Sequence, residues 1–118
     1  MPNALSQQFV KDYNAKYGGT PADINADAAE AYSVGETLAA AVNATKSLSN
    51  AKVISYLHSG VTLQTVQGPA KFNAIGENVV AAHFIFQWQT GSKFVQVLPT
   101  GASGSVAIVN PKPAWGSG

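Results

Sequence analysis

The first part of the chain carries apolar side chains at helical spacing. Aromatic or aliphatic residues recur at every fourth position: Leu5, Phe9, Tyr13 and Tyr17. They share one face of a helix that is predicted over residues 4–17, with Asn3 as a suitable N-cap residue. Gly18 and Gly19 follow, and glycine ends helices readily because it adopts the left-handed backbone conformation without a Cβ penalty. The pattern predicts a first helix that ends in a glycine turn.

A second apolar stripe follows Thr20-Pro21, a pair typical of a helix start because proline lacks the N–H that is not needed there. The stripe predicts a long helix over residues 22–44 and consists mainly of small side chains: Ala28, Ala31, Tyr32, Gly35, Leu38, Ala39 and Val42. Small side chains allow close packing, so we expect the stripe to be covered and Tyr32 to lie in the core. A short third helix is predicted over residues 50–58 with Ser49 as its N-cap.

After Gly60 the hydrophobic period changes from helical to alternating. Alternation predicts strands or extended connections over these ranges: 61–66, 70–73, 80–89, 93–98 and 105–109. Residues 90–92, Thr-Gly-Ser, favour a hairpin loop between the third and fourth of them. The aromatic face of the longest segment (Phe84, Phe86 and Trp88) is predicted to be core. A hairpin needs further partners to be stable, so this order of elements favours burial against additional structure.

Composition limits the classes of function. The chain has 118 residues, 46% of them hydrophobic and 11% charged, with a formal net charge of +1. Its basic residues are all lysines, and without arginine as a two-bond reader of guanine and phosphate we expect no nucleic-acid binding. No apolar run approaches the roughly 20 residues that span a bilayer, so we expect no membrane insertion. A charged fraction below the usual value of about 25% predicts extensive burial against a partner.

The sequence carries no recognisable catalytic or cofactor motif. It contains no cysteine, which excludes disulfides and thiolate metal ligands. It contains neither the nucleophile-elbow pattern G-x-S-x-G nor a dinucleotide or phosphate loop. His58 and His83 are more simply a helix-end residue and a strand-surface residue than metal ligands. We therefore expect no enzyme activity, no cofactor and no metal site.

An acidic cluster begins the second predicted helix. Asp23, Asp27 and Glu30 are spaced by four and three residues, which predicts that they share one helix face. Carboxylates favour a helix N-terminus through the helix dipole, and this structural role is the simplest interpretation. No histidine lies within helical reach of the cluster, which argues against a metal site.

Four motifs follow one another along the chain: Phe9-x-x-x-Tyr13-x-x-Lys16-Tyr17-Gly18 with Pro21; Ala31-Tyr32 with Leu38-Ala39-Ala40-Ala41; Gly68-Pro69-Ala70-Lys71-Phe72-Asn73-x-x-Gly76; and Phe86-Gln87-Trp88-Gln89 with Gly91-Ser92-Lys93-Phe94-Val95-Gln96-Val97-Leu98-Pro99. Their order and spacing resemble the C-terminal part of the type I periplasmic solute-binding proteins, the Leu/Ile/Val-binding group of ABC-importer receptors. The resemblance extends over about the last third of a family member. Ser33 and Asn73 stand where many members have acidic residues, which leaves the ligand open.

The resemblance implies an α/β fold of two lobes with a solute cleft between them. This chain would be the C-terminal part of that fold, helices first and then an antiparallel hairpin, and incomplete on its own. The implied assignment is residues 4–17 to the C-terminal lobe, 21–75 to the N-terminal lobe, 79–109 to strands of the C-terminal lobe, and 110–118 to a tail. Met1-Pro2 and Gly116-Ser117-Gly118 are typical of cloning boundaries, so we expect a natural signal peptide to be missing from this sequence.

The resemblance also implies a site and a function. In the family the start of the second helix faces the cleft, so Asn25, Asp27, Ala28 and Tyr32 are implied to border the ligand. The implied function is that of the periplasmic solute-binding component of an ABC importer. Its implied partners are a small polar molecule such as an amino acid, the ABC permease and the upstream part of the same protein, and this segment alone is expected to bind solute weakly.

A different interpretation rests on the apolar faces themselves. In it, the chain is an engineered or excised fragment that acts as a structural module. It would pair with another copy or with a complementary fragment through its helix stripes and its hairpin edge.

Overall fold

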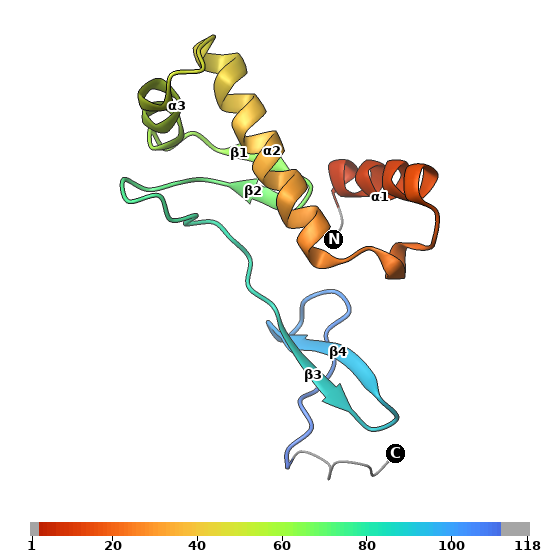
Figure 1. Cartoon of the computed structure of the whole chain (residues 1–118). Helices are drawn as coiled ribbons and strands as arrows, with labels where there is room; N and C mark the ends of the chain where they lie inside the picture. The colour runs from red at the N-terminus through yellow and green to blue at the C-terminus, as the bar shows by residue number, and fades with distance from the viewer. Residues whose placement is uncertain (1–2, 112–118) are drawn as a thin grey trace. The chain divides into compact units, whose positions relative to one another are not determined.

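The computed structural model describes residues 3–111 (Figure 1). The chain divides into two compact units, one that ends at Ala81 and one that begins at Ala82. The first unit contains three α-helices and a short hairpin, and the second contains a longer hairpin. This mixture of helices and small antiparallel sheets confirms the predicted α/β class.

Helix α1 (Ala4–Tyr17) has the predicted bounds because both of its ends are set by local signals. The Asn3 side chain accepts a hydrogen bond from the Ser6 N–H at 2.7 Å and so caps the first turn. At the other end Gly18, with a φ of 79°, donates its N–H to the Asn14 carbonyl at 2.8 Å. Glycine is suited to this conformation because it has no Cβ.

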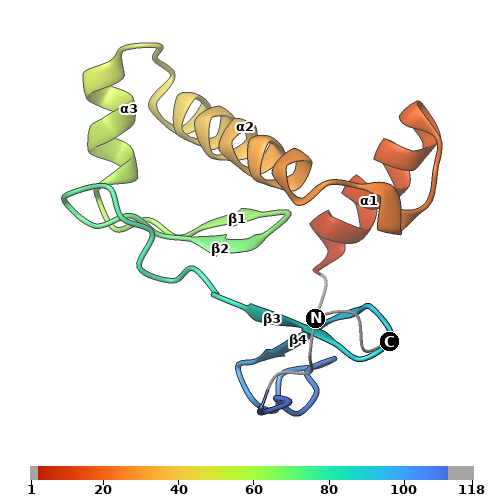
Figure 2. The same ribbon diagram turned by 60° about the horizontal axis from the view of Figure 1, so that its bottom comes forward.

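Helix α2 (Ala26–Thr45) begins later than predicted (Figure 2). A 3-10 turn, η1 (Pro21–Asp23), comes first, and extended backbone at Ile24 and Asn25 separates it from α2. The Asn25 side chain accepts from the Asp27 N–H at 2.9 Å, so Asn25 is the true N-cap. The prediction of one continuous helix from residue 22 is therefore wrong, because the Asn25 cap starts a separate element.

The covered face of α2 is not the predicted small-residue stripe. The buried residues of α2 are Ser33 and Ala41, and the helix contacts β1 (Leu63–Thr65) and α3 (Asn50–Leu57). On the predicted stripe, Tyr32 is 51% exposed and Leu38 is 54% exposed. The prediction of a covered stripe with Tyr32 in the core is wrong for the described chain. Small side chains lie on several sides of α2, so a face other than the predicted one can pack against β1 and α3.

The core of the first unit lies between α2, α3 and the hairpin formed by β1 and β2 (Gly68–Ala70). Figures 1 and 2 both show this hairpin beside α2. The strands pair antiparallel, with Leu63 opposite Ala70. Buried apolar side chains come from each element and the connecting turn: Ala41, Val53, Leu63, Val66 and Ala70. The second strand was predicted over residues 70–73, but β2 ends at Ala70. The predicted strand exists, and it lies earlier in the chain.

The second unit is built on β3 (Ile85–Gln89) and β4 (Lys93–Leu98). They pair antiparallel with Trp88 opposite Phe94, and the register shifts between Ile85 and Phe86. The β4 bounds agree with the prediction, whereas β3 is shorter than the predicted 80–89. The hairpin itself is confirmed.

Residues 105–109 do not form the predicted final strand. Side-chain amides hold this segment instead: Gln87 donates to the Val109 carbonyl and accepts from the Val109 N–H, each at 2.9 Å. Gln89 donates to the Ala107 carbonyl at 2.8 Å. The segment is thus held by glutamine side chains together with a backbone hydrogen bond from the Val106 N–H to the Gln96 carbonyl at 2.9 Å.

The aromatic face of the second hairpin is not its core. Phe84, Phe86 and Trp88 are about half exposed, whereas Val97 is buried. Phe94 packs against Phe86 and Trp88 with ring centroids 5.1 and 4.8 Å apart. The glutamines that bind residues 105–109 alternate with these aromatic residues along β3, and the predicted aromatic core is therefore wrong for the described chain.

Candidate functional site

A groove of about 360 Å³ lies between α1 and α2 in the first unit. We call it the aromatic groove because four of its lining residues carry rings. Its lining residues are Phe9, Asp12, Tyr13, Lys16, Tyr17, Ala28, Ala31 and Tyr32. Its volume falls in the range of roughly 300–1,000 Å³ that is usual for small-molecule sites.

The wall of the aromatic groove is a ladder of neighbouring rings. Along α1 the ring centroids of Phe9 and Tyr13 lie 5.6 Å apart, and those of Tyr13 and Tyr17 lie 4.7 Å apart. Tyr32 of α2 extends the ladder, with its centroid 4.9 Å from that of Phe9. These separations are typical of favourable aromatic pairs. The four-residue spacing seen in the sequence thus produces a continuous apolar wall.

Two opposite charges stand one helical turn apart in the same groove. Asp12 accepts a hydrogen bond from the Gln8 side chain at 2.7 Å. The Lys16 ammonium lies 5.2 Å from the centroid of the Tyr17 ring, within reach of a cation–π interaction. A carboxylate and an ammonium beside an apolar wall match the charges of a zwitterion with an apolar side chain.

The structure brings two of the four predicted ligand residues into the aromatic groove. Ala28 and Tyr32 line it, whereas Asn25 and Asp27 form the exposed cap of α2 on the preceding turn. Sequence reasoning missed Asp12 and Lys16. Asp12 and Lys16 are four residues apart, next to the aromatic stripe of α1, and this spacing could have identified them. A solvent-exposed helix face has the same spacing of charges, so the sequence does not distinguish the two.

The acidic cluster does not share one helix face as predicted. Asp23 belongs to η1, where its carboxylate accepts from the Thr20 N–H at 2.7 Å and from the Thr20 hydroxyl at 2.8 Å. These hydrogen bonds, the backbone one first, lower the pKa of Asp23, against a small opposing effect of burial. Asp23 therefore has a structural role at the turn.

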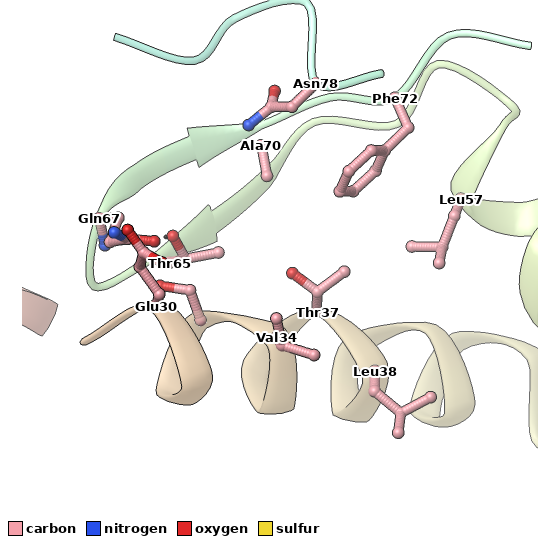
Figure 3. A pocket seen from close by; sticks show the side chains of 11 residues that line it. Glu30, Val34, Thr37, Leu38, Leu57, Thr65, Gln67, Ala70, Phe72 and Asn78 are labelled. Atoms are coloured by element: carbon pink, nitrogen blue, oxygen red, sulfur yellow. Dashed lines mark hydrogen bonds between the residues drawn. The ribbon is translucent and has the colours of Figure 1, made fainter. Parts of the chain in front are cut away.

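A second groove of about 550 Å³ lies between α2 and the β1–β2 hairpin (Figure 3). We call it the hairpin groove. Its lining residues come from α2, the end of α3, the hairpin and the segment after it: Glu30, Ser33, Val34, Thr37, Leu38, Leu57, Thr65, Gln67, Ala70, Phe72 and Asn78. The polar line of Glu30, Ser33 and Thr37 has helical spacing, which marks one side of this groove in the sequence.

Hydrogen bonds fix the rim of the hairpin groove. Glu36 accepts from the Val66 N–H at 2.8 Å and ties α2 to the hairpin. Thr65 donates its hydroxyl to the Gly68 carbonyl at 2.8 Å within the turn. Asn78 accepts from the Lys71 N–H at 3.0 Å and so fixes the segment that follows β2. The groove is therefore formed by elements that are held together on each side.

Two other kinds of feature are absent from the described residues: a metal-holding group and a membrane-spanning helix. Within residues 3–111, no group of three or more His, Asp or Glu side chains is arranged to hold a metal ion. No helix in this range combines the length and the apolar character needed to cross a bilayer. His58 ends α3 with its N–H donated to the Ile54 carbonyl, as predicted. His83 is exposed as predicted but precedes β3, so its predicted place on a strand is wrong.

The described chain thus offers two grooves large enough for a small molecule, one between two helices and one between a helix and a hairpin. A family model described as periplasmic binding protein matches residues 1–93. The chain therefore belongs to the periplasmic binding protein family, which confirms the type I, Leu/Ile/Val-binding-like resemblance and a partial α/β fold of this kind. No curated protein and no solved structure gives a significant match to the chain.

Proposed function

We propose that the chain acts within the solute-binding component of an ABC-type importer and that its solute is a small polar molecule such as an amino acid. The family match over residues 1–93 carries this proposal. The family has a solute-binding role, is generally non-enzymatic and is normally extracytoplasmic. We extend these properties to this chain and add a periplasmic location and an ABC permease as partner.

The aromatic groove is the proposed solute site. Lys16 would bind the carboxylate of an amino acid and Asp12 its ammonium, while the rings of Tyr13 and Tyr32 would cover its side chain. Charge-assisted hydrogen bonds of this kind are stronger than neutral ones. Asn25 and Asp27, on the turn of α2 that leads to Ala28, would border the ligand.

Transport would require a closing movement of two lobes around the solute. In the proposed assignment residues 4–17 and 79–109 belong to the C-terminal lobe and residues 21–75 to the N-terminal lobe, with an upstream part of the same protein completing both. A solute that binds the closed state more tightly shifts the population towards that state. The closed form would then be the one that the permease recognises.

Amide chemical-shift titration of the intact chain with leucine and phenylalanine tests the site. We expect weak but saturable shifts at Tyr13, Lys16 and Tyr32. A Lys16→Met variant should weaken binding about five-fold, as expected for an exposed ion pair. Lys11→Met is the matched control, because Lys11 is an exposed lysine of the same helix outside the groove. Equal losses in both variants, or no saturable shift, would reject the assignment.

Self-association as a structural module is a second candidate, favoured by exposed apolar side chains. Val34, Leu48 and Ile75 are 68%, 85% and 78% exposed, and self-association would remove such side chains from water. Native mass spectrometry and sedimentation over a range of concentrations test it. A dimer that Leu38→Glu dissociates would support this function, whereas a monomer at every concentration would exclude it.

A further inference from the structure

The hairpin groove has a polar end and an apolar end. Figure 3 shows Glu30, Gln67 and Thr65 gathered at one end and Phe72 and Leu57 at the other. Thr37 of α2 points into the space between the two ends, and Val34, one helical turn earlier, also lines the groove. A ligand that fills this groove needs a polar head and an apolar body.

The charge of the hairpin groove determines whether the polar group of a ligand should be positive or negative. Among the described residues that line it, Glu30 alone is ionisable. Glu36, on the same helix, is engaged by the Val66 N–H at 2.8 Å and lies outside the lining. The exposed Glu30 carboxylate therefore attracts a cation and repels an anion of the same size.

The length of the groove along α2 sets the size of the apolar body. Glu30 and Thr37 are seven residues apart, which corresponds to roughly 10 Å along a helix. The apolar surface over this distance comes from Val34, Leu57, Ala70 and Phe72, with Val34 68% exposed. An extended unbranched six-carbon amine is shorter than that distance, because each of its bonds advances the chain by less than the bond length of roughly 1.5 Å, so it fits within the groove.

We propose that the hairpin groove is a second binding site, specific for primary alkylammonium ligands. The ammonium lies against Glu30, and the alkyl chain extends past Val34 towards Leu57 and Phe72. This site uses different residues from the aromatic groove, so it goes beyond the proposed amino-acid site and does not depend on it.

Three six-carbon probes that differ only in the head group test the proposal on the intact chain: n-hexylamine, 1-hexanol and hexanoate at neutral pH, followed by amide chemical shifts. Hexylamine should shift Val34, Thr37 and Phe72 and bind about five-fold more tightly than hexanol, the upper end for an exposed ion pair. Hexanoate should bind more weakly than hexanol. Equal binding of all three probes would refute a role for Glu30.

Two variants locate the amine. Glu30→Gln should weaken hexylamine about five-fold and leave hexanol unchanged, because only the charge is removed. Asp12→Asn, which removes the carboxylate of the aromatic groove, should leave hexylamine binding unchanged. If Asp12→Asn weakens the amine and Glu30→Gln does not, the ligand occupies the aromatic groove and the proposal is wrong. Val34→Ser, at an exposed position, should weaken all three probes alike.

Discussion

At the scale of single residues, two glycines differ in backbone conformation and in the space that a Cβ would have. Gly19 has a φ of 82°, and a Cβ at this position would lie 3.2 Å from the Asp23 carboxylate, whereas Gly35 lies inside α2 with no heavy atom within 4 Å of such a Cβ. Gly19→Ala should lower the free energy of unfolding by about 1–2 kcal/mol. Gly35→Ala should raise it by about 0.5–1 kcal/mol. Urea denaturation of both variants checks the pair, and changes of the same sign would contradict the argument.

The Glu36 side chain joins α2 to the first hairpin through one hydrogen bond, which it accepts from the Val66 N–H. Glu36→Ala removes the acceptor of the buried Val66 N–H, and we expect a loss of about 1–3 kcal/mol in the free energy of unfolding. Glu36→Gln keeps an acceptor oxygen and should lose less. Urea denaturation measures both values, and amide exchange at Val66 reports the local effect. An equal loss in the two variants would show that the contact itself contributes little.

At the scale of elements, the turn η1 is sensitive to acid. Thr20 hydrogen bonds lower the pKa of Asp23 below its usual value of 3.8. Because the folded pKa lies below the unfolded one, the stabilisation is complete above the unfolded pKa and is lost as the pH falls through the folded pKa. The Thr20 amide resonance should therefore titrate at a pH below 3.8, the usual value. Asp23→Asn should abolish that titration, and a midpoint above the usual value would contradict the assignment.

The segment 105–109 depends on glutamine side chains for its position. Gln87→Ala removes both hydrogen bonds to Val109, so amide exchange at Val109 should accelerate by an amount equivalent to about 1–3 kcal/mol, or 0.5–1.5 kcal/mol per bond. Gln87→Glu keeps the acceptor but loses the donor and should have an intermediate effect. Gln64→Ala, at an exposed position of β1, is the control and should leave Val109 unchanged.

Helices and strands could be predicted where the residues that start and end them are close together in the sequence. The Asn3 cap, the four-residue aromatic spacing and Gly18 define α1 without any distant contact. The start of α2 was missed because the choice between Thr20 and Asn25 as the cap depends on where the Asp23 carboxylate binds. Residues 105–109 alternate like a strand, but which groups hold them depends on side chains about twenty residues earlier.

At the scale of the whole molecule, the two units differ in the size of their cores. In the described residues, the second unit buries Val97 as its apolar core residue, whereas the first buries apolar side chains from α2, α3 and the first hairpin. Amide exchange in increasing urea should therefore release residues 85–98 before α2 and α3. Val97→Ala should accelerate exchange only in the second unit. One cooperative transition that includes both units would contradict this prediction.

The sequence alone determined the features that depend on local spacing and on the order of motifs along the chain. These features are the α/β class, the bounds of α1, the second hairpin and the family. They could be predicted because motifs and their order are visible in the sequence without knowing which residues are in contact. The tertiary structure decided which faces are covered. Small side chains lie on more than one side of α2, so only its contacts with β1 and α3 showed that Ser33 and Ala41 are buried. Likewise, only the structure showed that Asp12 and Lys16 share a groove with Ala28 and Tyr32 of α2, the groove proposed as the solute site.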